Sequence, residues 1–123
     1  MSQKTPTLSE LEVGSELPEL PIEITTSLVV GGAIASRDFT PVHHDREAAK
    51  AAGMPDVFMN ILTTNGLVSR YITDWAGPDA LIRNVSIRLG TPNTPGETMT
   101  LRGKVVELSE QDATVEVAGA NSW

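Results

Sequence analysis

A change in the spacing of apolar residues constrains the fold of this chain most. From about Met59 to Trp75, apolar residues recur every three or four positions, which predicts a helix. Residues 80–89, 98–108 and 113–118 instead alternate apolar and polar residues between turn-forming segments, which predicts antiparallel strands. A strand meander that follows a helix predicts an α+β fold, in which the helix lies on one face of an antiparallel sheet.

The first half of the chain supplies the remaining elements. Residues 1–17 are polar and are interpreted as an N-terminal arm. Residues 18–25 alternate and predict a strand, which two prolines confine to the edge of a sheet. Residues 27–36 are apolar and short, so the pattern allows a strand or a helix of small residues, and we prefer the helix. Residues 45–52 predict a further helix that begins at the N-cap Asp45.

Composition and charge exclude several classes of function. The chain has 123 residues, which is enough for a single domain over 1–123. Its net charge of −7 argues against a nucleic-acid partner, because a phosphate backbone needs a clustered basic face. The absence of cysteine excludes a disulfide scaffold, a thiol nucleophile and cysteine-ligated zinc. No apolar run is long enough to span a membrane and no secretory signal is visible, so no membrane association and a cytoplasmic location are expected.

The predicted sheet is small and leaves an edge that must be covered or paired. The sequence also ends at Trp123 in the middle of an expected turn, so a final strand is either missing or supplied otherwise. Both features favour an oligomer that continues the sheet or shares a helix face.

Asp38 and His43 form the best candidate for chemistry, with four residues between them. A histidine is the commonest general base near neutral pH, and a carboxylate is its commonest partner. Pro41 fixes its own φ and disfavours the helical region for Thr40, so the segment is expected to be a rigid turn. The spacing allows a catalytic pair without demanding one: Asp38 could also be a turn residue, and His43 a packed side chain.

The residues next to Asp38 and His43 have several possible roles. His44 is expected to face away from the pair, because adjacent side chains of an extended turn point apart. Arg37 could neutralise Asp38 or reach solvent, and the sequence leaves both open. We expect no metal site, since zinc would need more spaced ligands than Asp38 and the two histidines provide.

The stretch from Ser36 to His43, followed by Ala49, resembles the signature of MaoC-like, R-specific enoyl-CoA hydratases. Asp38, Pro41, His43 and Ala49 match that pattern. The resemblance implies a hot-dog fold, in which an antiparallel sheet wraps around a long central helix. It covers about residues 10–118.

The sequence departs from the family pattern at three places. Arg37 replaces a usual glycine, Thr40 replaces a usual asparagine, and Met59-Asn60 replaces a common His-Gly pair. The longer runs ASRDFTPVHHDREAA and NILTTNGLVSRYITDWAGP look more like the small catalytic subunit of actinobacterial steroid side-chain enoyl-CoA hydratases. This branch implies pairing with a second, larger MaoC-like chain and a steroid enoyl-CoA substrate from cholesterol side-chain β-oxidation.

The resemblance implies that Asp38 and His43 hold one water molecule against the double bond of a trans-2-enoyl thioester. Backbone N–H groups at a helix N-terminus suit the thioester oxygen, and Asn60 and Ile61 are the candidates. The Asn60 side chain could instead be the N-cap. No cofactor is expected, since coenzyme A is part of the substrate.

The sequence also offers candidates for binding coenzyme A and two alternative functions. The cations that could meet the phosphates of coenzyme A, or only solubilise the chain, are Arg83, Arg88, Arg102 and Lys104. One alternative function is a non-catalytic hot-dog subunit that supports a partner hydratase. Another is an acyl-CoA thioesterase, whose carboxylate usually lies on the central helix, but residues 59–73 contain no acidic residue.

Overall fold

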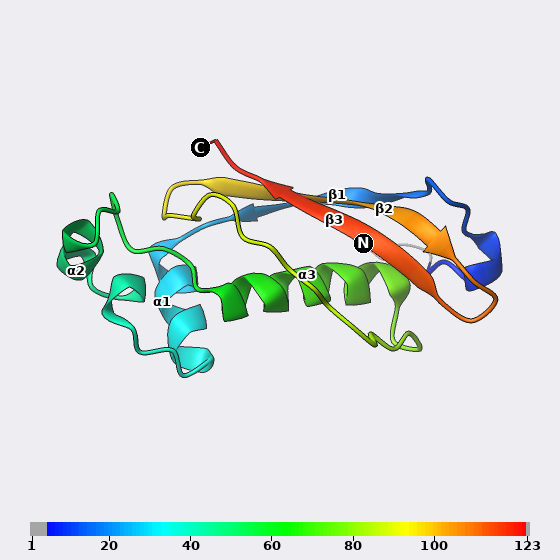
Figure 1. The fold of residues 1–123 in the computed structure, drawn as a ribbon, viewed down its shortest axis with the longest axis horizontal. Coiled ribbons are helices and arrows are strands. Elements are labelled where there is room, and N and C mark those ends of the chain that lie inside the picture. The colour runs from blue at the N-terminus through cyan, green and yellow to red at the C-terminus, as the bar shows by residue number, and fades with distance from the viewer. Residues whose placement is uncertain (1–4, 123) are drawn as a thin grey trace.

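The computed structural model describes residues 5–122, which form an antiparallel sheet with a long helix lying lengthwise along it (Figure 1). The elements in chain order are η1 (Leu8–Glu10), β1 (Glu16–Glu23), α1 (Thr26–Ala35), η2 (Pro41–His43), α2 (Arg46–Ala51), α3 (Ile61–Ala76), β2 (Thr98–Leu108) and β3 (Ala113–Ala120). The predicted α+β arrangement is confirmed. Residues 1–4 of the expected arm and Trp123 lie outside the described residues.

The sheet has the order β1-β2-β3, with both pairs antiparallel. Leu20 of β1 is opposite Leu101 of β2, and Val105 of β2 is opposite Val115 of β3. The register of β1 slips between Leu17 and Leu20, where Pro18 cannot donate a backbone hydrogen bond. The predicted place of this proline-containing strand at the sheet edge is therefore confirmed.

The core lies between the sheet and α3. Tyr71 of α3 is buried, and its hydroxyl donates a hydrogen bond of 2.7 Å to the carbonyl of Pro18. Gly103 of β2 allows this approach, because a Cβ there would lie 3.3 Å from Tyr71 Cε2. Trp75 packs against the same core while remaining partly exposed. Both aromatic residues therefore belong to the structural core.

Residues 27–36, for which a helix is the preferred prediction, form helix α1, so this prediction is confirmed. Thr25 caps it by accepting a hydrogen bond from the N–H of Leu28, and Val29 is buried beneath it. Gly32 faces α3 so closely that a Cβ there would lie 2.2 Å from Thr63 Oγ1. Gly32 therefore allows α1 and α3 to pack closely, as the preferred interpretation of a closely packed helix requires.

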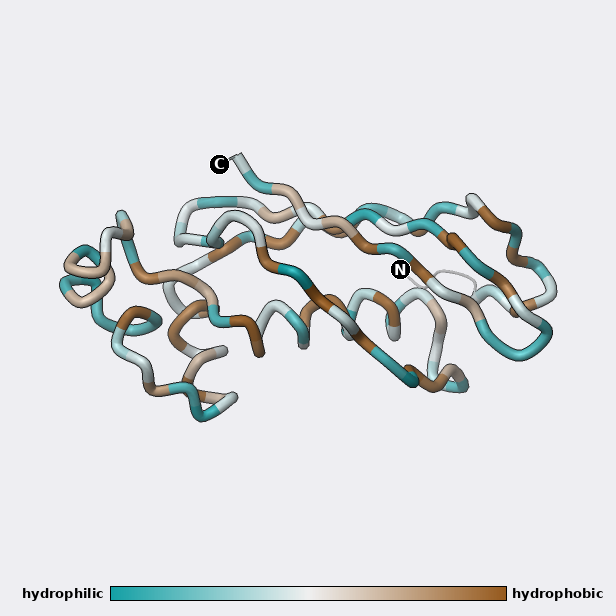
Figure 2. Tube along the Cα trace, viewed as in Figure 1, coloured by the Kyte–Doolittle hydropathy of each residue, from teal (hydrophilic) through white to brown (hydrophobic). Residues whose placement is uncertain are grey.

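The prediction of a strand over 80–89 is wrong. This segment is extended but belongs to no sheet, and it runs back along the molecule from the end of α3 to the start of β2 (Figure 1). Its apolar and polar residues do alternate (Figure 2), but Leu81 and Leu89 are exposed. Between Leu81 and Gly90, no backbone hydrogen bond joins it to another described residue. Alternation predicts an extended backbone, whereas a strand also needs a hydrogen-bonded neighbour.

The other helices lie close to their expected positions. The helix expected at 59–75 is α3, and the helix expected at 45–52 is α2, capped by Asp45 as predicted. No helix within residues 5–122 combines the length and the apolar composition needed to cross a membrane.

Candidate active site

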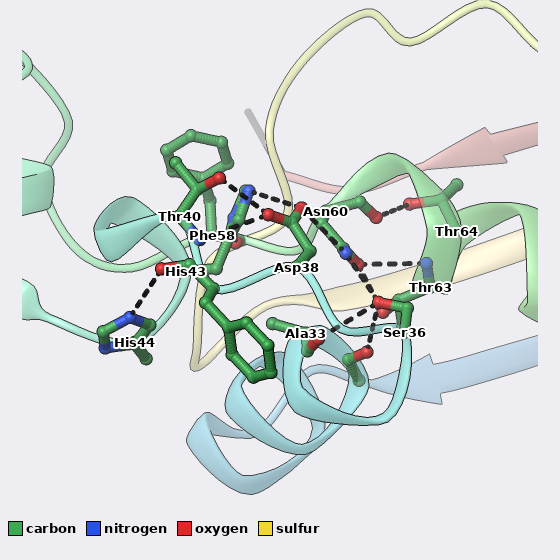
Figure 3. A network of polar contacts seen from close by, with 12 residues as sticks. Ala33, Ser36, Asp38, Thr40, His43, His44, Phe58, Asn60, Thr63 and Thr64 are labelled. Carbon is green, nitrogen blue, oxygen red and sulfur yellow. Dashed lines mark hydrogen bonds and ion pairs between the residues drawn. The ribbon is translucent and has the colours of Figure 1, made fainter.

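Asp38 lies on a tight turn that follows α1. Arg37 has a φ of 58°, in the left-handed region that costs a non-glycine residue free energy. The N–H of Asp38 then donates a 2.9 Å hydrogen bond to the carbonyl of Ala33, the carbonyl of an earlier turn of α1. The turn places the Asp38 carboxylate beside η2 and the beginning of α3 (Figure 3).

Three hydrogen bonds hold the Asp38 carboxylate. Its Oδ1 accepts from the hydroxyl of Thr40 at 2.7 Å and from the Thr40 N–H at 3.2 Å. Its Oδ2 accepts from Asn60 Nδ2 at 3.1 Å. The Thr40 hydroxyl, followed by the Asn60 amide, lowers the pKa of Asp38 below its ordinary value. Asp38 is therefore ionised at neutral pH and well below it.

His43 ends the short helix η2 that Pro41 begins, and it is buried, with 8% of its surface exposed. Its Nδ1 lies 2.7 Å from the carbonyl oxygen of Phe58, which can only accept, so Nδ1 carries the proton. Its Nε2 lies 3.4 Å from Asp38 Oδ2. The ring of Phe58 packs edge-on against the imidazole, with 5.0 Å between the ring centroids. The carbonyl and the ring together fix the tautomer and orientation of His43.

This geometry suits the activation of a water molecule. In the neutral imidazole, Nε2 is an acceptor, and the Asp38 carboxylate beside it is also an acceptor. A water molecule placed to one side of the two atoms can donate one O–H to each of them. Two acceptors that share one water molecule form a pair that can take a proton from it.

The beginning of α3 closes the site from another side. The Asn60 side chain is the N-cap of α3, with its Oδ1 accepting the Thr63 N–H at 3.0 Å. The backbone N–H groups of Asn60 and Ile61 form no hydrogen bond with another residue of the described range. Asn60 is buried, whereas Ile61 is 47% exposed.

Two neighbours singled out in the sequence lie outside this network. His44 is exposed and its Nε2 pairs with the carbonyl oxygen of Phe39, so its ring faces away from Asp38 (Figure 3). Among the ion pairs of residues 5–122, Asp38 faces His43 and not the exposed Arg37. The pKa shift of Asp38 likewise has no contribution from Arg37.

The basic residues considered for coenzyme A are exposed and separate from the polar network. Arg102 of β2 pairs with Glu19 of β1 at 2.7 Å. Arg83 and Arg88 lie on the extended segment after α3, and Lys104 lies on β2. Within residues 5–122, no three His, Cys, Asp or Glu side chains gather into a group that could hold a metal ion.

Sequence reasoning missed three contributors to the site. Ser36 accepts a hydrogen bond from Asn60, Thr63 donates two to Asn60, and the Phe58 carbonyl orients His43. Thr63 follows the N-cap by three residues, a spacing that could have identified its N–H as the capped group. Ser36 and Phe58 carry no such signal, because their roles depend on contacts between distant segments.

An open groove of about 310 Å³ lies between α1 and α3, next to the Asn60 network. Its lining is mostly apolar and includes Gly32, Ala35, Ser36, Leu62, Thr63, Gly66 and Leu67. Gly66 leaves space there, because a Cβ at this position would meet nothing within 4 Å. The site therefore combines a polar network with an adjoining apolar surface.

Comparisons with known proteins agree with this arrangement. The family model described as MaoC like domain matches residues 11–122. The 3-oxo-4,17-pregnadiene-20-carboxyl-CoA hydratase beta subunit of Mycobacterium tuberculosis is 48% identical over 110 residues, which are 89% of this chain and 85% of that protein.

Solved structures give the same grouping. The ChsH1-ChsH2 complex from Mycobacterium tuberculosis matches with a TM-score of 0.89 and 48% identity, over 90% of this chain and 87% of that chain. R-hydratase PhaJ1 from Pseudomonas aeruginosa, at 22% identity, shares the fold with a TM-score of 0.85 over 94% of this chain and 75% of that one. The predicted hot-dog fold and the predicted kinship with hydratases are confirmed. The chain belongs to the MaoC-like family.

Proposed function

We propose that this chain hydrates the double bond of a trans-2-enoyl-CoA thioester, with Asp38 and His43 as the catalytic pair. The observation that supports this most is the 3.4 Å approach of His43 Nε2 to Asp38 Oδ2, with Nδ1 engaged by the Phe58 carbonyl. Asn60 holds Asp38 Oδ2, and the Phe58 carbonyl holds the imidazole through Nδ1, so with a neutral His43 the two facing atoms are positioned acceptors for one water molecule.

In the proposed reaction, the water oxygen forms a bond to C3 while one member of the pair takes its proton. The pair then delivers a proton to C2, where the electrons of the broken double bond have moved. The pair ends in the protonation state in which it began, and the reverse sequence dehydrates the product. A general acid–base pair of this kind contributes roughly 10²- to 10⁴-fold to the rate.

Negative charge develops on the thioester oxygen during this addition. We assign the backbone N–H groups of Asn60 and Ile61, at the positive end of α3, to that oxygen. Neither N–H is used by another residue of the described range, which supports the assignment.

The relatives suggest the substrate and the assembly. One relative is named as the beta subunit of a hydratase for a steroid-like acyl-CoA, and a related chain was solved in a complex of two different proteins. We infer that this chain works in a hetero-oligomer with a second MaoC-like chain, on a steroid side-chain enoyl-CoA of cholesterol degradation. Coenzyme A belongs to the substrate and no further cofactor is proposed. The cytoplasm is the proposed location.

The test compares a steroid enoyl-CoA with a short linear one, with and without the second chain. Asp38→Asn and His43→Ala should each lower turnover by roughly 10²-fold or more while the complex still assembles. His44→Ala is the matched control, because this exposed imidazole lies outside the network, and it should retain activity. Turnover near that of the wild type in either pair variant would contradict the proposal.

The same assay separates the alternatives. A non-catalytic subunit would leave turnover of the complex unchanged after both substitutions. A thioesterase would release free thiol from a saturated acyl-CoA, which a hydratase does not.

A further inference from the structure

Asn60 uses all the hydrogen-bonding capacity of its side-chain amide within a buried site. Its Oδ1 accepts from the N–H and the hydroxyl of Thr63, and its Nδ2 donates to Ser36 Oγ at 2.9 Å and to Asp38 Oδ2 at 3.1 Å. Only 2% of the residue is exposed. A buried amide with every donor and acceptor engaged has one favourable orientation.

Neighbouring groups determine which way this amide points. The Thr63 N–H can only donate, so the oxygen of Asn60 must face α3. The hydroxyl of Ser36 donates to the Gly32 carbonyl at 2.7 Å, so its oxygen is free to accept from Nδ2. The amide nitrogen is thereby directed at Asp38, and rotation of the amide by 180° would break these bonds together.

The contact falls on the carboxylate oxygen that faces His43. Asp38 Oδ2 accepts from Asn60 and also lies 3.4 Å from His43 Nε2, while Oδ1 is held by Thr40 (Figure 3). Each carboxylate oxygen therefore has its own donor. Thr40 alone would leave the carboxylate able to pivot about Oδ1, and Asn60 prevents that motion.

We propose that Asn60 is a positioning residue, whose side-chain amide holds Asp38 Oδ2 against His43 Nε2. This inference rests on the proposed function, because it concerns the same catalytic pair. It differs from the backbone role given to Asn60 above, since the side chain acts through Asp38 and the backbone N–H faces the substrate. The arrangement joins α1 through Ser36, α3 through Thr63 and the catalytic turn through Asp38 at a single amide.

A purely structural role is the competing explanation, because Asn60 also caps α3. Two variants separate the roles. In Asn60→Asp, a carboxylate of nearly the same shape still accepts from the Thr63 N–H but cannot donate to Asp38. In Asn60→Ser, the hydroxyl still suits an N-cap, but it is too short to replace the bond to Asp38.

The experiment measures kcat and KM of the complex with the enoyl-CoA that the wild type hydrates. We expect kcat to fall by about 10- to 100-fold in both variants, the range found when a partner that orients a functional ligand is removed. KM should change by less than about 3-fold, because the substituted side chain acts through Asp38. Thermal unfolding of each variant reports whether the cap is retained.

A second measurement needs no substrate. The side-chain carboxyl of Asp38 is titrated by carbon NMR in the wild type and in both variants. Loss of the Asn60 donor should raise the pKa of Asp38, with the larger rise in Asn60→Asp, where a second carboxylate lies beside it. His43 is the titratable group that faces Asp38 within the described residues, so His43→Ala is titrated as the reference for its contribution.

Retention of kcat within about 2-fold in both variants would overturn the inference, and so would an unchanged pKa of Asp38. Failure of the proposed function looks different, because Asp38→Asn itself would then remain active. If Asn60→Asp does not fold, the kinetics and titration of Asn60→Ser decide the question.

Discussion

The beginning of α3 contrasts with the extended segment over residues 80–90 that follows this helix. Around Asn60 the polar groups are buried or half-buried and bonded to one another, and the residues come from two stretches of the chain, 36–43 and 58–63. Along 80–90 the side chains of Leu81, Ile82 and Leu89 are exposed, with Leu81 at 81%, while Val85 and Ile87 are half-buried; the backbone from Leu81 to Gly90 forms no hydrogen bond with another described residue. The hydrogen bonds around Asn60 fix the conformation of the first region, whereas the second region has the alternation of a strand but no paired strand among the described residues.

The contrast shows what a local pattern can specify. Asn60 caps α3 as the local sequence favours, and the same side chain contacts the turn after α1, beside η2. Local preference and tertiary contact therefore stabilise the same arrangement. In residues 80–90, the alternation of apolar and polar residues favours an extended backbone but does not indicate which strand would pair with it. A sheet needs pairing between distant segments, which a sequence pattern does not supply.

Of the substitutions that test this contrast, Gly32→Ala, which adds one methyl group beside the hydrogen bonds of Asn60, should reduce stability most. Gly32→Ala would place a Cβ 2.2 Å from Thr63 Oγ1, so Thr63 would have to move away from Asn60. Overpacking of this kind costs about 1–3 kcal/mol, and we expect hydratase activity to fall with it. Thermal or urea unfolding and the hydration assay measure the two effects.

Gly31→Ala is the matched control for that substitution. Gly31 is in the same helix, but a Cβ there would meet nothing within 4 Å. Replacement of glycine by alanine in a helix should then stabilise the protein by up to about 1 kcal/mol. Equal destabilisation by the two substitutions would show that Gly32 has no special packing role.

A smaller effect concerns the ionisation of Asp38. The Thr40 hydroxyl is the leading cause that lowers the pKa of Asp38, so Thr40→Val should raise that pKa toward its ordinary value of about 3.9. Because the proposed mechanism uses an ionised Asp38, we expect the variant to begin to lose activity at a higher pH than the wild type as the solution is acidified. Thr40→Ser keeps the hydroxyl and should keep the wild-type profile.

The measurement is the same carboxyl titration by carbon NMR, with the acid limb of kcat/KM beside it. An unchanged Asp38 pKa in Thr40→Val would show that the short Thr40 bond does not hold the carboxylate in solution.

The conformation of the segment from Asp38 to His43 was predictable because its signals are local. Pro41 indicates a turn, and this turn places Asp38 and His43 near each other, although Asn60 and the Phe58 carbonyl then fix how the two side chains face. The N-cap of α3 was also within reach of the sequence, as one of two uses considered for Asn60. Their catalytic roles remain predictions that the substitutions above test.

Other features depend on contacts that no local pattern contains. The Phe58 carbonyl that orients His43 lies 15 residues away in sequence, and Ser36 lies 24 residues from Asn60. The helix preferred for residues 27–36 is confirmed as α1, but its packing against Thr63 is revealed only by the folded chain. The strand predicted at 80–89 failed for the same reason, because alternation says nothing about pairing.

The smallest expected change in stability comes from a substitution in the extended segment after α3. Leu81→Ala should change the free energy of unfolding of the isolated chain by less than about 0.5 kcal/mol, because the side chain is 81% exposed. Leu101→Ala is the matched control, since Leu101 is 2% exposed and its truncation should cost about 2–5 kcal/mol. Urea unfolding of the two variants measures both values. A loss above about 1 kcal/mol in Leu81→Ala would mean that the extended segment packs within the isolated chain, and the contrast with the Asn60 network would then disappear.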